Sequence, residues 1–190
     1  RGRAALMASG DPIELTDAAK RAFSVQDYSP APVIQGVQLV ELKRITDDGG
    51  SFMELARLQQ GMAAALPGFE CRQLNYSELE AGAIKAFHVH RRQTDVWFVP
   101  PGDKMLVILL DVREGSKSRG AQRRIVLGDG TSRLLAIPPG VAHGVKNLAA
   151  SRGHIIYLVD TQFSPDPDQT EEGRLPWDFA GPEIWDVARG

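Results

Sequence analysis

Hydrophobic residues in the second half of the chain occur in short runs separated by turn residues. Eight segments combine alternating or continuous apolar positions with β-branched and aromatic residues, the pattern of half-buried or buried strands. They are Glu70–Ser77, Ile84–His90, Asp95–Val99, Lys104–Arg113, Arg123–Leu127, Arg133–Ile137, Val141–Asn147 and His154–Thr161. The turns between them include Pro100-Pro101-Gly102, Gly128-Asp129-Gly130 and Pro138-Pro139-Gly140. This pattern predicts an all-β fold, an antiparallel double sheet or barrel of the jelly-roll type.

The first part of the chain has a mixed pattern. A short helix capped by its first residue is predicted over Asp11–Ser24. Residues Ala31–Ile45 have the apolar spacing of a strand that ends at the turn Asp47-Asp48-Gly49-Gly50. Residues Phe52–Ala65 are compatible with a second helix, which Pro67-Gly68 would stop.

Domain organisation follows from these patterns. We expect residues 1–30 to form an N-terminal extension, with a leader-like segment up to Gly10, and residues 31–190 to form a single domain. The tail from Gln162 is irregular, and its Glu171-Glu172-Gly173 is expected to be an exposed loop. Four apolar residues of the tail are expected to fold back as a lid or a dimer contact: Trp177, Phe179, Ile184 and Trp185.

Composition and charge exclude several classes of protein. The chain has 190 residues, 43% of them hydrophobic, which suffices for one sizeable core. Its formal net charge of -2 gives no basic excess for nucleic acid, and its longest apolar run, Met105–Leu110, is too short to span a bilayer. The single Cys71 cannot form an internal disulfide, so a cytoplasmic location is expected.

Residues that could catalyse a reaction or bind a metal are concentrated on two predicted strands. His88 and His90 are two residues apart, so they project from the same face of an extended strand, with Lys85 and Phe87 expected near the mouth of the cavity they enter. His143 follows the turn Pro138-Pro139-Gly140 on another strand. Three of the four histidines therefore point to one site.

The spacing around these histidines resembles that of the cupins, a family with a double-stranded β-helix (jelly-roll) fold. The first half of the pattern is Gly82, five residues, His88-Val89-His90, four residues and Asp95, and the second is Pro138-Pro139-Gly140, two residues and His143. This resemblance implies a possible metal site in which His88, His90, Asp95 and His143 surround a divalent ion such as Fe, Zn, Mn or Ni.

A second resemblance extends from about Val33 to Val187. Its landmarks occur in one order along the chain: Val37–Glu41, Asp47–Glu54, Gln73–Ser77, Gly82–His88, Leu110–Arg113, Ile137–Gly144, Ile156–Val159, Trp177 and Trp185. They resemble the dTDP-4-dehydrorhamnose 3,5-epimerases, cupins that need no cofactor and act on nucleotide-linked 4-keto sugars. The resemblance also implies a homodimer in which Val33–Leu42 crosses to the partner's sheet.

The resemblance implies roles for individual residues. His88 would be the base that removes the proton next to the ketone, and Tyr157 would return a proton on the other face of the resulting enolate. His143, Lys85 and His90 would contact substrate, and two further residues, Phe52 and Glu54, would hold the nucleotide.

The sequence departs from the epimerase pattern at four points. Lys85 replaces an arginine, Asp95 replaces a lysine that stabilises the enolate, and His90 replaces a glutamine. The family's aspartate partner of the base is expected beyond Gly190. The paired histidines followed by Gln93 are also similar to sugar 3,4-ketoisomerases.

Three functions remain open from the sequence alone. The first is an isomerase that abstracts a proton next to a carbonyl, with a nucleotide-linked keto sugar or a related small metabolite as substrate. The second is a metal-dependent isomerase, oxygenase or lyase. The third is a non-catalytic binding cupin. A metal on His88 would occupy the lone pair that a base needs, so the first two exclude each other at that residue.

Overall fold

The computed structural model describes residues 12–187, and its contacts divide the chain between Pro30 and Ala31. The first unit contains helix α1 (Asp17–Ala22), which Thr16 caps by accepting a hydrogen bond from the backbone of Ala19 at 3.3 Å. The predicted helix therefore exists over a shorter range with a different cap. Asp11 and the leader-like segment lie outside the described residues.

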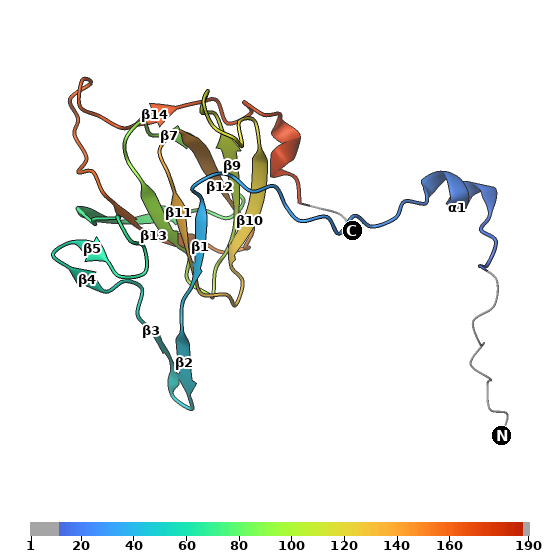
Figure 1. Cartoon of the computed structure of the whole chain (residues 1–190). Helices are drawn as coiled ribbons and strands as arrows, with labels where there is room; N and C mark the ends of the chain where they lie inside the picture. The colour runs from blue at the N-terminus through green and yellow to red at the C-terminus, as the bar shows by residue number, and fades with distance from the viewer. Residues whose placement is uncertain (1–11, 188–190) are drawn as a thin grey trace. The chain divides into compact units, whose positions relative to one another are not determined.

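The second unit is built on two five-stranded antiparallel sheets (Figure 1). The first has the order β1 (Gln38–Glu41), β11 (Arg133–Ile137), β8 (Asp95–Phe98), β13 (Gly153–Val159) and β6 (Gln73–Leu79). The second has the order β10 (Gln122–Gly128), β9 (Lys104–Asp111), β12 (Val141–Asn147), β7 (Ile84–Val89) and β14 (Gly173–Arg174). The predicted all-β jelly roll is confirmed, and each of the eight predicted strands has a counterpart.

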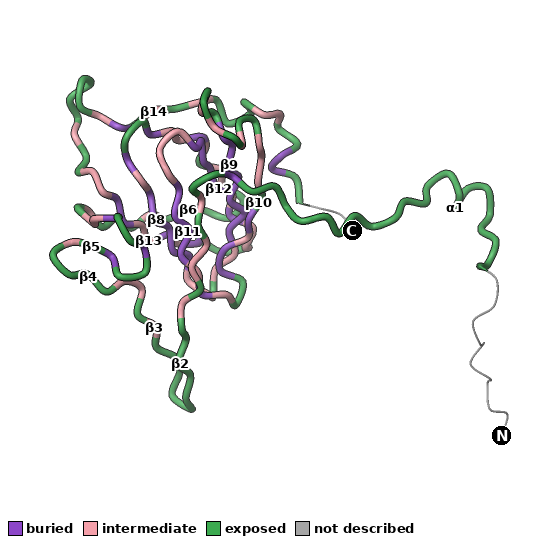
Figure 2. The backbone as a smooth tube through the Cα atoms, viewed as in Figure 1, coloured by how far each residue is buried: buried purple, intermediate pink, exposed green. Residues whose placement is uncertain are grey.

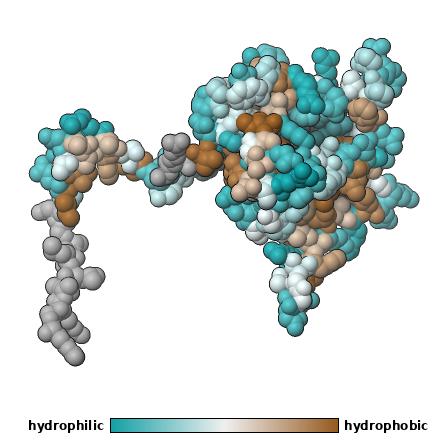
Figure 3. Space-filling view, turned by 180° about the vertical axis from the view of Figure 1, so that it is seen from behind, coloured by the Kyte–Doolittle hydropathy of each residue, from teal (hydrophilic) through white to brown (hydrophobic). Residues whose placement is uncertain are grey.

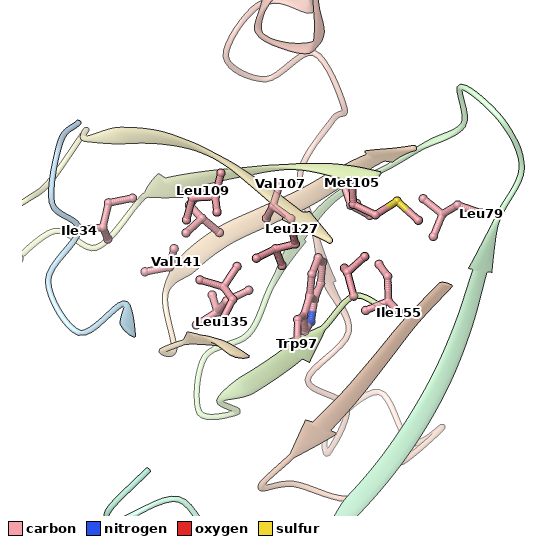
Figure 4. Packing of buried hydrophobic residues seen from close by; sticks show 14 residues of the cluster. Ile34, Leu79, Trp97, Met105, Val107, Leu109, Leu127, Leu135, Val141 and Ile155 are labelled. Carbon is pink, nitrogen blue, oxygen red and sulfur yellow. The ribbon is translucent and has the colours of Figure 1, made fainter. Parts of the chain in front are cut away.

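Alternation along the strands fills the space between the sheets. On β8, Trp97 and the following Val99 enter this core, whereas Val96 and Phe98 pack on the outer face. Figure 4 shows the core closed by Met105, Val107 and Leu109 of β9 opposite Leu135 and Trp97. Buried residues accordingly follow the central strands in Figure 2.

The region before β6 differs from the prediction. The expected strand Ala31–Ile45 is split into β1 and β2 (Arg44–Asp47), and β2 forms an exposed hairpin with β3 (Gly50–Met53). The predicted helix over Phe52–Ala65 is wrong, because this range includes the end of β3 and the hairpin of β4 (Leu58–Gln59) with β5 (Met62–Ala63).

Turn geometry and tertiary packing explain that error. Gln60 and Gly61 have φ values of 51° and 84°, a left-handed turn that a helix cannot contain. Ala63, Leu66 and Phe69 cover the outer face of the first sheet. Burial of these apolar side chains therefore overrides the weak helical spacing.

The tail folds back onto the outer face of the second sheet. The 3-10 helix η1 (Pro182–Trp185) buries Ile184 and Trp185 against a cluster that includes Phe87, whose ring centroid lies 5.4 Å from that of Trp185. A Cβ on Gly144 would lie 2.9 Å from the Trp185 ring, so glycine is needed for this packing.

Other parts of the tail depart from expectation. Trp177 and Phe179 stay about half exposed, with 49% and 53% of their surface accessible. The expected exposed loop at Glu171-Glu172-Gly173 is wrong, since Glu171 is buried and Gly173 pairs with Val89 as part of β14. Within residues 12–187, no helix is long and apolar enough to cross a membrane.

Candidate active site

A cavity of about 420 Å³ opens between the two sheets. Its polar side chains come from six strands, namely β6, β7, β8, β12, β13 and β14, and from the segments that follow β7 and precede β14. Its lining comprises Ser77, Leu79, Lys85, His88, His90, Gln93, Asp95, Trp97, His143, Val145, Ile155, Tyr157, Glu172 and Arg174. The cavity thus collects three histidines, two carboxylates, two cations and a tyrosine.

Strand pairing brings the three histidines together. His88 of β7 lies opposite His143 of β12, and their rings stack with centroids 5.9 Å apart and planes 14° apart. His90 follows β7, and its ring centroid lies 6.3 Å from that of His88 and 5.2 Å from that of His143. His90 and His143 are buried, whereas His88 is partly exposed to the cavity.

A register shift determines which neighbours of His88 share its face. Between the pairs His143 with His88 and Val145 with Lys85, β7 advances three residues and β12 only two. This bulge re-aims the side chains, so Lys85 and His88 both line the cavity although an odd number of residues separates them. Phe87, which was expected at the cavity mouth, is instead fully buried on the opposite face of the sheet.

Asp95 lies at the centre of the polar wall. Its Oδ1 accepts a hydrogen bond from Gln93 Nε2 at 2.7 Å and lies 3.5 Å from His90 Nε2. Its Oδ2 accepts from Trp97 Nε1 at 3.0 Å and lies 3.5 Å from His143 Nε2. Burial opposes ionisation of Asp95, but the adjacent histidines outweigh it and hold the pKa of the carboxyl well below its usual range. Asp95 is therefore an anion.

Two of the histidines have their orientation fixed by backbone carbonyl groups. His90 Nδ1 bonds to the carbonyl oxygen of Glu171, and His143 Nδ1 bonds to that of Val141 at 3.0 Å. A carbonyl oxygen can only accept, so each Nδ1 carries the proton. Each ring then turns Nε2 toward Asp95. Burial lowers the pKa of His90, but the adjacent Asp95 outweighs it and raises that pKa above its usual value. In the described part of the chain, the buried His143 Nε2 has no hydrogen-bond partner.

The third histidine has a different environment. Nδ1 of His88 lies 3.7 Å from Oε2 of Glu172 in the tail. Burial, together with the nearby His143 and Arg174, lowers the pKa of His88 to about 3. The imidazole is therefore uncharged at neutral pH.

Tyr157 enters the cavity from the other sheet. It lies on β13, and its ring centroid is 6.5 Å from that of Trp97. Burial and the charges of Asp95 and Glu172 raise the pKa of its hydroxyl group. The phenol therefore keeps its proton across the neutral range and faces the cavity opposite the histidine strands.

Two predicted nucleotide contacts lie elsewhere. Phe52 is exposed on β3, and Glu54 pairs with Arg57 at 2.9 Å, and neither lines the cavity. Conversely, three cavity residues were not predicted from the sequence as site residues: Trp97, Glu172 and Arg174. Trp97 was recognisable, because it shares the inward face of Asp95 on a predicted strand. No local sequence pattern marked the two tail residues, Glu172 and Arg174, as site residues.

The family of the chain is established by comparison with known proteins. A family model described as dTDP-4-dehydrorhamnose 3,5-epimerase matches residues 32–178. A spore coat polysaccharide biosynthesis protein, SpsL of Bacillus subtilis, is 41% identical over 146 residues, which cover 77% of this chain and 91% of that protein.

Solved structures agree with this assignment. A dTDP sugar isomerase from Desulfovibrio desulfuricans G20 superimposes with a TM-score of 0.69 at 28% identity, covering 82% of this chain and 94% of the other. A dTDP-4-dehydrorhamnose 3,5-epimerase from Bacillus anthracis, with TDP and PPi bound, has a TM-score of 0.64 at 25% identity over 81% and 87% of the two chains. The chain therefore belongs to the dTDP-4-dehydrorhamnose 3,5-epimerase family.

Proposed function

We propose that this protein is an epimerase of a 4-keto sugar carried on a nucleoside diphosphate. The observation that carries the proposal is the position of His88 and Tyr157, which line one cavity from opposite sheets. Inversion of a carbon requires a base on one face and an acid on the other. Two side chains on facing walls supply that arrangement for a sugar ring held between them.

Proton transfer would run as follows. Because Nδ1 of His88 faces Glu172, Nε2 is the atom available to take the proton from the carbon next to the ketone. The electrons of that C–H bond move into an enolate. The hydroxyl group of Tyr157 then returns a proton to the same carbon from the other face, and exchange with solvent restores both side chains.

Glu172 would strengthen a base that is otherwise weak. A histidine with a pKa of about 3 is uncharged at neutral pH and can accept a proton. Its low basicity, however, makes that proton transfer unfavourable. A carboxylate 3.7 Å from Nδ1 stabilises the imidazolium as it forms. We assign Glu172 as the partner of the base in this chain.

Cationic side chains at the cavity suit a diphosphate. Lys85 donates hydrogen bonds to Ser77 Oγ at 3.2 Å and to the carbonyl oxygen of Glu78 at 2.9 Å, which hold its ammonium group at the cavity wall. Arg174 lies beside Glu172, with 3.7 Å between guanidinium and carboxylate. We propose that these two cations contact the phosphates and that His90 and His143 lie at the sugar end.

Solvent exchange tests the function directly. With a dTDP-4-keto-6-deoxy sugar in deuterated solvent, the wild-type protein should incorporate deuterium next to the ketone and invert that carbon. His88→Asn should lower incorporation by about 10²–10⁴-fold and leave binding of the nucleotide sugar nearly unchanged. His154→Gln is the matched control, since His154 does not line the cavity. Wild-type exchange in His88→Asn would refute the assignment of the base.

Product analysis in the same experiment separates epimerisation from 3,4-ketoisomerisation. A product with its ketone at the adjacent carbon would identify ketoisomerisation and contradict the epimerase proposal. Absence of both turnover and nucleotide binding would instead support a non-catalytic protein. The cytoplasmic location expected from the sequence stays a prediction.

We further propose a homodimer. Exposed apolar residues interrupt the hydrophilic surface of the larger unit (Figure 3). Leu74 and Tyr76 on edge strand β6 are 65% and 61% exposed, and Ile45 and Phe52 of the β2–β3 hairpin are 53% and 66% exposed. A second copy would cover such side chains. Within one chain β1 pairs with β11, and the crossing of Val33–Leu42 to a partner's sheet stays a prediction.

The dimer has its own test. Leu74→Glu with Tyr76→Glu should shift sedimentation from dimer to monomer, because it places charge on an apolar face. Thr161→Glu is the control, because Thr161 lies in the loop that follows β13 of the same sheet. A wild-type protein that sediments as a monomer would refute the dimer.

A further inference from the structure

We propose that Glu171 is a positioning residue of the cavity. Its carboxylate fastens the tail to the turn that follows β7, and the fastened tail holds His90 and Glu172 at the cavity wall. The part that concerns Glu172 rests on the proposed function, in which Glu172 is the partner of the base. The fastening itself needs no assumption about the reaction.

Burial distinguishes Glu171 from the rest of the tail. From Gln162 to Glu183, all of which the structure describes, Glu171 is the only buried residue, and most of its neighbours are exposed. Burial of a charged group is costly unless hydrogen bonds and opposite charges compensate it. An acidic side chain that turns inward from an exposed segment must therefore have strong partners.

Three donors surround the carboxylate of Glu171. Its Oε2 accepts hydrogen bonds from the backbone N–H groups of Arg91 at 2.7 Å and Arg92 at 2.8 Å. Its Oε1 accepts from Nε of Arg92 at 2.6 Å. The Glu171 side chain is only 5% exposed, so these charge-assisted bonds lie away from water, where they are strong. Two of the three donors are backbone groups, so the bonds fix the path of the main chain.

The turn that Glu171 holds carries two residues of the cavity. Residues 90–94 lie between β7 and β8, outside the sheet ladders, so the N–H groups of Arg91 and Arg92 need acceptors from elsewhere. Glu171 supplies one from about 80 positions away in the sequence. His90 directly precedes this pair, and Gln93, which donates to Asp95, directly follows it. The carboxylate therefore sets where both cavity side chains begin.

The tail continues from Glu171 along the edge of β7. The carbonyl oxygen of Glu171 accepts from Nδ1 of His90 and from the N–H group of Gly173 at 2.9 Å. Gly173 then pairs with Val89, where β14 lies beside β7 (Figure 1). A Cβ on Gly173 would collide with the carbonyl oxygen of Val89, so this close approach needs glycine. Glu172 is thus held between two fixed neighbours, with its carboxylate 3.7 Å from Nδ1 of His88.

β14 by itself is a weak attachment. It has only two residues, and the next buried residues of the tail, Ile184 and Trp185, begin ten positions after Arg174 (184 − 174 = 10). Glu171 is the anchor on the other side of β14. Loss of its bonds should free Glu172 and Gly173 locally while Trp185 stays packed, because short segments can open without unfolding of the domain.

Limited proteolysis tests the fastening without substrate. Arg174 has a side chain that is 59% exposed, but trypsin can cut after it only when β14 leaves β7. Glu171→Gln replaces one acceptor oxygen by an amide group that faces N–H donors. Cleavage after Arg174, identified by mass spectrometry, should become about tenfold faster or more. Glu80→Gln is the matched control and should be cut at the wild-type rate, since Glu80 pairs with Arg152 at the surface.

A double-mutant cycle tests whether Glu171 acts through Glu172. Glu171→Gln should slow solvent exchange of the substrate proton by about 10–100-fold, with a much smaller change in KM. The same substitution made in Glu172→Gln protein should cost less than about threefold, because two residues that act through one another are not additive. A residue that only supports the fold would lower the amount of active protein and leave kcat per folded molecule unchanged.

Two outcomes would overturn the proposal. One is cleavage after Arg174 at the wild-type rate in Glu171→Gln, which would show that β14 stays in place without this carboxylate. The other is full additivity in the cycle, which would show that Glu171 does not act through Glu172. Circular dichroism verifies folding, and if Glu171→Gln does not fold, Arg92→Gln replaces it, since it removes one donor and keeps both backbone bonds. A wild-type protein without turnover would refute the proposed function, and proteolysis would still test the fastening.

Discussion

The carboxylate of Glu172 lies 3.7 Å from Nδ1 of His88, although 84 positions separate the two residues in the sequence (172 − 88 = 84). β14 creates this contact, because its Arg174 pairs with His88 along the edge of β7. Two partly exposed side chains, an imidazole and a carboxylate, thus meet at the cavity. Their relationship makes the tail part of the candidate active site.

The first prediction concerns this pair. Glu172→Gln keeps the size of the side chain and removes the charge that stabilises the imidazolium of His88. We expect solvent exchange of the substrate proton to slow by about 10–100-fold, with KM nearly unchanged. Rates of deuterium incorporation measure the effect.

A charge-conserving variant is the control for Glu172. Glu172→Asp should retain more of the exchange rate than Glu172→Gln, because it keeps the carboxylate. Equal losses in both variants would indicate that Glu172 acts only by packing. The pH profile adds a second readout, since only loss of the charge should alter the pH dependence of the base.

The second prediction separates the two proton transfers. Tyr157→Phe removes the proposed acid and leaves the base, so deuterium incorporation should continue while inversion falls by about 10²–10⁴-fold. Proton NMR of the recovered sugar distinguishes the two. If Tyr157→Phe inverts the carbon at the wild-type rate, the acid must be another group.

The third prediction concerns stability at low pH. The side chain of Asp111 is fully buried and accepts hydrogen bonds from Arg113 at 2.8 Å and from Ser116 and Ser118. The Arg113 guanidinium, above all, holds the pKa of Asp111 well below its usual range. A lowered folded-state pKa stabilises the fold above the unfolded pKa of about 3.9, and this stability is lost as the pH falls further toward the folded value.

Chemical denaturation at several pH values checks the direction of this pH dependence of stability. Asp111→Asn should cost about 2–3 kcal/mol at pH 7, because it leaves Arg113 without its anion. The difference from wild type should shrink as the pH falls below about 4. Glu114→Gln is the matched control, since Glu114 pairs with Arg119 at the surface. A difference that stays constant with pH would contradict the ionised state of Asp111.

The fourth prediction tests how the tail is anchored. Trp185 is 2% exposed, packs on Phe87 and donates a hydrogen bond to the carbonyl oxygen of Trp177 at 2.9 Å. Trp185→Ala should lower the free energy of unfolding by about 3–5 kcal/mol. Trp177→Ala, at a half-exposed position, should cost much less. Similar losses in both variants would show that burial does not govern this region.

The sequence determined which residues face the core and which face the cavity within each strand. Two-residue periodicity places Asp95 and Trp97 on one face and Val96 and Phe98 on the other, and the strand containing Ile84–His90 aims His88 and His90 the same way. Turn residues divided the second half into its eight strands. These signals are local, so they can be recognised without knowing the fold.

Tertiary structure decided the rest. Phe52–Ala65 has helical spacing, but a left-handed turn and burial against the first sheet make it hairpins. The bulge on β7 that turns Lys85 into the cavity depends on its pairing with β12. The carbonyl group of Glu171 that fixes His90, and the carboxylate of Glu172 beside His88, come from a tail that no local pattern places at the cavity. Contacts between segments far apart in the sequence form only when the whole chain folds. Local sequence patterns therefore cannot predict them.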